Sequence, residues 1–309
     1  MEMKNTRKMF QNFPGYDRHR FPEKIERVTA GAGGEALLLL GSEKTALLDC
    51  GMAYCADQLI ENIKNILHRK HRTLDVILLS HTHYDHIGAL PYVLKEWPNA
   101  QVFGAAHCQR VFASEGARRK IQELGQVAWS KYRQDLPSEI LVEGMKIDRI
   151  LRDYDQVSLG EEWVVAIETK GHTDCSMTYV LQPDGVMFAS ESTGVLESPD
   201  FMHVSILKSY QESMASAEKC RDYPISHLVS PHYGSIPDFF IPEYWRLFVA
   251  SAEMKRDYLF ELHLNNLSFE EMLATYTKKY WNETRGAEQP KEAFLENAKN
   301  IIAAIIKEF

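Results

Sequence analysis

The sequence has no long apolar run, and none of its hydrophobic stretches approaches the roughly 18 residues that cross a bilayer. Residues 1–8 carry some positive charge, but no apolar segment follows them, so we do not expect a secretory signal. Cysteine is scarce as well. The five thiols are odd in number and scattered, which fits reduced intracellular cysteines better than a disulfide framework. We therefore expect a cytoplasmic protein that does not bind membranes.

Positive charge is also in short supply. Lysine and arginine number 35 against 43 acidic residues, and the formal net charge is −8. Because phosphate backbones attract basic surfaces, this balance argues against a nucleic acid as partner. The 309 residues, 45% of them hydrophobic, suffice for one large domain with a full core and an extension. The expected partner is a small-molecule substrate, and a homodimer is left open.

What the chain does contain is a hexapeptide rich in metal ligands, His-Thr-His-Tyr-Asp-His at residues 81–86, directly after an apolar run. Imidazole nitrogen and carboxylate oxygen bind divalent metals, and each ion needs at least three protein ligands. His81 and His83 stand two residues apart, so on an extended segment they point the same way and can share one ion. Asp85 and His86 then face a second position. The spacing predicts two ions about 3.5–4 Å apart, bridged by a water acidified to hydroxide.

Four ligands in one loop cannot supply at least three ligands to each of two ions. Three further candidate ligands follow apolar runs downstream. His172 comes after the strand-like run 163–169 and a glycine, and it would complete the first site. His232 follows the apolar stretch 227–229 in the same context and would complete the second site. Glu191 ends another apolar run and is the candidate bridging ligand.

The order of these ligands, with Asp49 upstream, resembles that of the metallo-β-lactamase fold hydrolase superfamily, over roughly residues 25 to 240. The resemblance implies an α/β protein: an αββα four-layer sandwich with two mixed sheets, helices outside and a binuclear metal site at one sheet edge. It also implies that Asp49 is not a ligand but hydrogen-bonds the metal loop, which orients the histidines. The implied activity is metal-dependent hydrolysis of an ester, a thioester or a phosphodiester by a metal-bridging hydroxide.

The chain departs from the family at the acidic motif, which usually reads Gly-Asp-Thr and here reads Ser190-Glu191-Ser192. The extra methylene of glutamate still allows it to bridge two ions, but it can also push them apart, favour monodentate binding or lower the occupancy of one site. Ser190 adds a side chain where the backbone normally passes close to the ligands. Zinc is the first expectation for both ions, with iron or manganese as alternatives, since imidazole and carboxylate suit all three metals.

In the implied mechanism Asp85 orients the nucleophile and carries protons. The candidates that could protonate the leaving group are His203, His227 and Tyr233. Tyr233 is preferred among them because it adjoins His232.

Two cysteines and a basic run flank the predicted site. We expect Cys50 and Cys175 to be buried, inert thiols rather than extra ligands. The basic residues 118–120 could meet an anionic substrate, but a solvated helix face is the preferred interpretation.

Hydrophobic periodicity places the remaining elements. It predicts strands at 36–40, 46–48 and 100–103, helices at 57–67 and 89–96, and one or two helices within 107–136. After Pro242 the pattern becomes helical. One helix runs from Pro242 to about 264, a second begins at the Ser268-x-x-Glu271 capping box and ends near 282, and a third follows Pro290.

These patterns divide the chain into a catalytic domain at 1–240 and a helical C-terminal extension at 241–309. The extension is either a packing or dimer element, or a lid whose aromatic side chains narrow the metal cleft. The aromatic candidates for the lid are Tyr244, Trp245, Phe248, Tyr258, Phe260, Tyr276, Tyr280 and Trp281.

Two other classes of function stay open. An iron-dependent sulfur dioxygenase would need only His81, His83 and either His172 or a neighbouring carboxylate. A two-iron flavodiiron reductase is less favoured, because it would require glutamate where His83 stands and a flavodoxin-like domain after the core. A non-catalytic regulatory module of the same fold is the other alternative, although apart from Glu191 the ligand set is intact.

Overall fold

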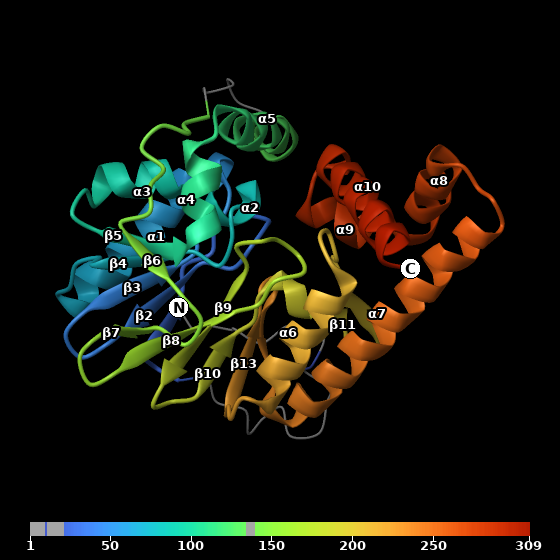
Figure 1. The fold of residues 1–309 in the computed structure, drawn as a ribbon. Coiled ribbons are helices and arrows are strands. Elements are labelled where there is room, and N and C mark those ends of the chain that lie inside the picture. Colours follow the sequence, from blue (N-terminus) through green and yellow to red (C-terminus); the bar gives the residue numbers. More distant parts are fainter. Residues whose placement is uncertain (1–9, 11–21, 134–139) are drawn as a thin grey trace.

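The computed structural model describes residue 10 and residues 22–133 and 140–309 (Figure 1). The expectations about residues 1–8 and 134–136 lie outside the described residues. Twelve of the described strands form two six-stranded sheets. Sheet one contains β1 (Ile25–Arg27), β2 (Leu37–Leu40), β3 (Thr45–Leu48), β4 (Val76–Leu78), β5 (Gln101–Ala105) and β6 (Arg149–Leu151), in that order. Sheet two has the order β14 (Gly234–Ile236), β13 (His227–Ser230), β10 (Val186–Phe188), β9 (Met177–Gln182), β8 (Trp163–Glu168) and β7 (Gln156–Ser158).

Both sheets are mixed, and each combines antiparallel pairs with parallel ones. In sheet one β3, β4, β5 and β6 are parallel neighbours, whereas β1, β2 and β3 pair antiparallel. In sheet two only β10 and β13 pair in parallel. A separate hairpin joins β11 (Val195–Ser198) to β12 (Phe201–His203).

The strands are apolar on both faces because each sheet is covered on both sides. Leu37 and Leu39 of β2 share the cluster between the sheets with Val164 of β8. Leu38 instead packs on the helix side of sheet one, and Val165 packs on the helix side of sheet two. Alternate residues of a strand point to opposite faces of the sheet. Because both faces are buried here, apolar residues follow one another without interruption along the strand. The predicted αββα sandwich is confirmed.

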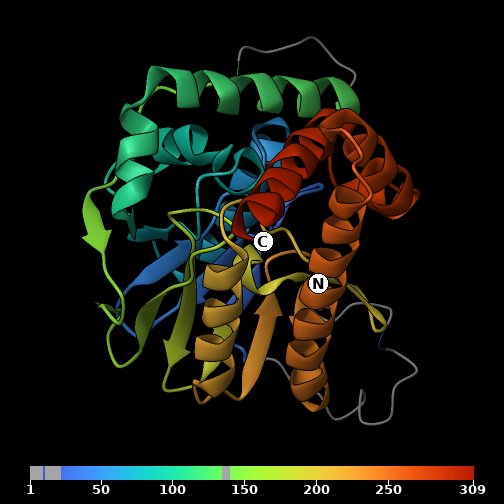
Figure 2. The same ribbon diagram turned by 45° about the vertical axis from the view of Figure 1, so that its right-hand side comes forward.

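The helices form the outer layers and the tail (Figures 1 and 2). Those before sheet two are α1 (Ala56–Lys70), α2 (Tyr84–Ile87), α3 (Leu90–Glu96), α4 (Ala106–Ala113) and α5 (Glu115–Tyr132). The later ones are α6 (Tyr210–Asp222), α7 (Ile241–Leu264), α8 (Phe269–Tyr280), α9 (Glu283–Glu288) and α10 (Lys291–Glu308). Short 3-10 turns occupy Ala53–Cys55, Glu191–Thr193 and Asp238–Phe240. In Figure 2, α5 lies across one end of the molecule beside α10.

The predicted elements recur within a few residues of their expected bounds, and the helical C-terminal region is present. The capping box of α8 forms as predicted: Ser268 N donates to Glu271 Oε2 (2.8 Å), and Glu271 N donates to Ser268 Oγ (3.4 Å). The short helices α6 and α9 and the β11–β12 hairpin were not predicted. Among the described residues no helix combines the length and apolar character needed to span a bilayer.

The tail packs on sheet two and continues its core. Tyr244 and Phe248 of α7 and Tyr276 of α8 are fully buried in the same apolar cluster as Val180 and Met187 of sheet two. The tail is therefore part of the packed core of the described residues.

Candidate metal centre

The hexapeptide 81–86 runs from the loop after β4 into α2, which begins at Tyr84. Asp49, at the end of β3, holds the start of that loop. Asp49 Oδ1 accepts a hydrogen bond from Ser80 N (2.7 Å), and Asp49 Oδ2 accepts one from Ser80 Oγ (2.5 Å). Asp49 has φ 53°, in the left-handed region that aspartate tolerates better than most side chains. On the other side, Met177 N of β9 donates to Ser80 O (2.8 Å), so both sheets hold the loop.

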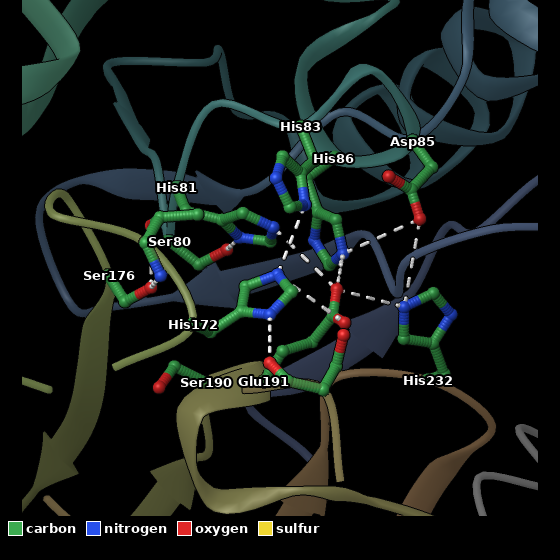
Figure 3. Close-up of polar contacts among 12 residues, drawn as sticks. Ser80, His81, His83, Asp85, His86, His172, Ser176, Ser190, Glu191 and His232 are labelled. Atoms are coloured by element: carbon green, nitrogen blue, oxygen red, sulfur yellow. Dashed lines mark hydrogen bonds and ion pairs between the residues drawn. The ribbon is translucent and has the colours of Figure 1, made fainter. Parts of the chain in front are cut away.

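The three downstream candidates reach the same place from sheet two, each from a loop that follows a strand. His172 lies after β8, Glu191 after β10 and His232 after β13 (Figure 3). The turn before His172 requires glycine, since Gly171 has φ 120° and a Cβ there would lie 2.4 Å from Ser213 N.

Glu191 stands between the histidines of the two predicted sites (Figure 3). Its Oε1 lies 3.0 Å from His86 Nε2, 3.3 Å from His232 Nε2 and 3.6 Å from His81 Nε2. Its Oε2 lies 3.5 Å from His172 Nε2. The long glutamate side chain therefore presents a separate oxygen toward His172.

Two groups of ligand atoms result, and they share Glu191. One is made of His81, His83, His172 and Glu191, the other of Asp85, His86, Glu191 and His232, and within each group the ligand atoms all lie within 4.8 Å of one another. The groups have the mixed nitrogen and oxygen donors of divalent transition-metal sites. All seven predicted ligands thus come together, and they fit a two-metal site.

The histidines are oriented by partners on the far side of their rings. His172 Nδ1 lies 2.6 Å from Ser205 O, His81 Nδ1 lies 3.0 Å from Ser80 Oγ, and His86 Nδ1 lies 2.9 Å from Asp49 Oδ2. Such contacts turn the Nε2 atoms toward the centre. His81 Nε2 is buried and has no hydrogen-bond partner among the described residues. A buried nitrogen without a partner calls for an explanation, and a bound cation supplies one.

The buried centre holds its carboxylate ionised and two of its histidines neutral. Burial raises the pKa of Glu191, but the charge of His172 and hydrogen bonds from His232 and His86 outweigh it and hold that pKa well below its usual range. Burial and neighbouring histidines lower the pKa of His83 to about 3. They also hold the pKa of His81 well below its ordinary value. Both rings are therefore neutral at neutral pH, which is the form that binds a cation.

His86 differs in the direction of its shift. Burial lowers its pKa, but the charge of Asp85 and hydrogen bonds to Asp49 and Glu191 raise it more, so that the pKa lies well above its ordinary value. A proton on His86 balances the carboxylates when no cation is present, so a cation that binds at this position has to displace it.

Serine replaces the usual glycine at position 190 without disturbing the ligands. Ser190 is buried, and its Oγ lies 2.8 Å from Thr169 Oγ1, so its hydroxyl has a partner in the loop that follows β8. This contact shows how the sandwich accommodates the side chain.

A cavity of about 420 Å³ opens onto the centre. His83, Asp85, Glu191 and His232 form its base, and Tyr233 lines it with φ 69°. His203 also lines the cavity and is buried, whereas His227 stands at the opposite end of β13 from His232 and is not among the lining residues described. His227 is therefore not in position to protonate a leaving group there.

The aromatic residues that were expected to form a lid do not line the cavity, so the prediction of these residues is wrong. None of the eight aromatic candidates is among the described residues that line the cavity. The tail does cover it, but through α9 and α10, with Arg285, Glu288, Gln289, Ala293, Glu296, Asn297 and Asn300. Five of the aromatic candidates are buried in the apolar cluster of sheet two instead, where they remove a large apolar surface from water: Tyr244, Trp245, Phe248, Tyr276 and Tyr280. Of the basic residues 118–120, Lys120 lines the cavity.

Two features of the site escaped the sequence reasoning. Gly34 packs on the His86 ring, where an added Cβ would lie 2.5 Å from His86 Cε1. The glycine-rich run 31–34 was the available signal for such a close approach. Arg285 and Glu197 form a buried ion pair of 2.5 Å at the cavity wall, and their separation along the chain offers no signal. Cys50 and Cys175 are buried, and neither belongs to a candidate metal group of the described residues.

Comparison with known proteins agrees with this architecture. The chain is 30% identical to a probable metallo-hydrolase of Burkholderia pseudomallei over 151 residues, 46% of this chain and 45% of the relative. It is 27% identical to a coenzyme F420H2 oxidase of Methanocaldococcus jannaschii over 167 residues, 53% of this chain and 34% of the relative. The chain thus spans less than half the length of these curated relatives.

A solved structure extends the fold comparison over most of the chain. A metallo-beta-lactamase family protein of Thermus thermophilus matches with a TM-score of 0.61 at 17% identity, covering 93% of this chain and 95% of the other. The family model of the Metallo-beta-lactamase superfamily matches residues 31–232, a stretch that holds Asp49 and all seven clustered ligands. The chain therefore belongs to the metallo-beta-lactamase superfamily.

Proposed function

We propose that the protein is a metal-dependent hydrolase that holds two divalent ions and cleaves an ester, a thioester or a phosphodiester. The observation that carries the proposal is the pair of ligand groups that share Glu191 at the base of an open cavity. His81, His83 and His172 would hold one ion, and Asp85, His86 and His232 the other. Zinc is the first candidate, with iron and manganese suited to the same donors.

Bound there, the ions would acidify a water and polarise the carbonyl or phosphoryl oxygen of the substrate. Asp85 lines the cavity, and its Oδ2 lies 3.7 Å from His232 Nε2 and 3.8 Å from His86 Nε2. From this position its carboxylate would orient the attacking water and accept its proton. Tyr233, at the cavity wall, is the proposed hydrogen-bond donor to the leaving group.

Iron-dependent redox chemistry is the second candidate, and the similarity to the F420H2 oxidase favours it. The flavodiiron type is disfavoured, because it requires glutamate at the position that His83 occupies here. A mononuclear dioxygenase would use the His81 group alone and leave the Asp85 group without a role. The intact second group therefore supports hydrolysis.

The deciding experiment is elemental analysis of protein purified without added metal or chelator, followed by rate measurements on esters, thioesters and phosphodiesters. Two zinc or manganese ions per chain with hydrolysis would support the proposal. One iron per chain with consumption of oxygen would replace it by the dioxygenase. A protein that binds no metal and hydrolyses nothing would point to the regulatory module.

A further inference from the structure

The cavity above the metal centre is apolar along its inner wall. It lies between α4 and α5 on one side and α9 and α10 on the other, with the hairpin β11–β12 beside it. The apolar lining residues include Val111, Ala117, Ile121, Leu124, Val195, Leu207 and Ala293. Ile121, Val195, Leu207 and Ala293 are themselves buried, so this wall is packed and largely preformed.

The lysine and arginine side chains that line the cavity already face carboxylates. Lys120 Nζ lies 3.5 Å from Glu296 Oε2, and Lys208 Nζ lies 3.7 Å from Asp174 Oδ2. All four side chains are about half exposed and stand at the rim. Such surface pairs contribute little to stability, but they leave no lysine charge uncompensated.

Deeper in the cavity, Arg285 Nη2 donates to Glu197 Oε1 (2.5 Å), and both side chains are buried. Arg285 Nε donates in addition to Tyr280 O (3.0 Å). Removing Glu197 from this pair would leave a buried charge without its partner, which is strongly unfavourable. The charge of Arg285 is therefore already compensated within the protein.

Carboxylates outnumber permanent cations on this lining. Asp174, Glu197, Glu288 and Glu296 stand against Lys120, Lys208 and Arg285. An anionic group on the substrate, away from the bond to be cleaved, would meet an apolar wall and lysine and arginine charges that already face carboxylates. Transfer of a charge to such a wall is costly unless a counter-charge is provided.

We propose, resting on the proposed function, that the substrate is an uncharged carboxylic ester or thioester. Its apolar acyl or alkyl group lies between α5 and α10. Thioesters of anionic carriers do not match this lining. The cleaved bond would lie over the metal centre, and the apolar group would extend along Val111, Leu124 and Ala293.

A binding experiment tests the lining independently of catalysis. The zinc-loaded full chain is titrated by calorimetry with octanohydroxamic acid and with the hydroxamic acid of equal length that ends in a carboxylate. We expect the neutral probe to bind at least about tenfold more tightly, and also more tightly than acetohydroxamic acid, since each buried methylene adds to affinity. Equal or tighter binding of the carboxylate probe, or no gain with chain length, would overturn the inference.

Three variants test where the apolar group binds and how the charged rim affects binding. Ala117→Phe fills the cavity from α5. It should weaken the binding of octanohydroxamic acid by about tenfold and leave the binding of acetohydroxamic acid unchanged. The matched control is Ala303→Phe, at an exposed position of α10 that does not line the cavity. Glu296→Gln removes the carboxylate that faces Lys120. It should reduce the difference in affinity between octanohydroxamic acid and the probe that ends in a carboxylate. If the Ala303 variant weakens the long probe as much as the Ala117 variant does, the placement is wrong.

Hydrolysis is measured separately, with p-nitrophenyl octanoate and bis(p-nitrophenyl) phosphate. If neither is cleaved while the neutral probe still binds preferentially, the proposed function fails and the assignment of the lining stands. Faster cleavage of the phosphodiester than of the ester would overturn the assignment and leave hydrolysis intact.

Discussion

His86 Nδ1 lies 2.9 Å from Asp49 Oδ2, so a carboxylate at the end of β3 fixes the ring of a histidine in the second ligand group. The same carboxylate accepts hydrogen bonds from Ser80 N and Ser80 Oγ. Asp49 thus connects the backbone of the metal loop to one of its ligands. It also raises the pKa of His86, together with Asp85 and Glu191.

Asp49→Asn should weaken metal binding or hydrolysis by about 10- to 100-fold, because the amide cannot accept from both Ser80 and His86 in the same way. Competition with a fluorescent chelator measures the affinity. The control is Asp75→Asn, whose carboxylate accepts from Thr45 N (2.8 Å) in sheet one, remote from the ligand groups. Equal losses in both variants would show that the Asp49 effect is only structural.

His83→Ala should retain one ion per chain, because it removes a ligand from the first group and leaves the second complete. We expect hydrolysis to fall at least about a hundredfold, since the remaining ion cannot position both reactants. Elemental analysis gives the metal count and initial rates give the loss, with thermal melting as the check on folding. An unchanged count of two ions would remove His83 from the ligand set.

Glu191→Asp and Glu191→Gln form a matched pair that tests bridging. The aspartate keeps the charge and should preserve two ions per chain, whereas the glutamine loses the charge that both groups share and should bind fewer. Metal counts after dialysis against defined zinc concentrations separate the cases. Loss of one ion in the aspartate variant alone would mean that this centre has adapted to the longer side chain, with its separate oxygen toward His172.

The clustering of the candidate ligands could be predicted from the sequence because their signals are local. Four stand in one hexapeptide, and His172 and His232 each follow an apolar strand, so the sheet edge brings them together. His203 and His227 could not be separated in this way, since only the packed sheets show which end of a strand faces the cavity.

Hydrophobic periodicity could not predict which residues line the cavity. An apolar stripe on a helix predicts a buried face but not the partner, so the aromatic residues of α7 and α8 were assigned equally to core and lid. The pairing of Arg285 with Glu197 depends on how α9 docks beside the hairpin β11–β12, which no local pattern encodes.

Deleting residues 242–309 should give insoluble or unfolded protein. The deletion removes Tyr244, Trp245 and Phe248, which are buried against sheet two, and exposes that face to water. The soluble fraction and the far-ultraviolet circular dichroism report the result. Phe309→Ala, at an exposed position of the tail, is the control and should remain soluble. A soluble, folded deletion protein would show that the tail is dispensable for the core.

Lys255 supplies a test of stability against pH. Its side chain is fully enclosed between α7 and α8, and its Nζ donates to Val204 O (2.5 Å) and Tyr276 Oη (3.1 Å). Burial holds its pKa well below 10.5, and the charge of Arg285 lowers it further. The unfolded chain therefore binds more protons than the folded protein at pH values between the lowered pKa and 10.5. In that range the free energy of unfolding rises with pH.

Lys255→Met removes this dependence. The difference in unfolding free energy between variant and wild type should shift in favour of the wild type as pH rises toward 10.5, by up to about 1.4 kcal/mol per pH unit. The lost hydrogen bonds add an offset that does not vary with pH, so the slope alone reports the lysine. Urea unfolding at a series of pH values measures it, with the exposed Lys278→Met as the control that should show no slope. A pH-independent difference for Lys255→Met would mean that the buried amine keeps an ordinary pKa. In that case the carboxylate of Glu197 would compensate its charge as well as that of Arg285.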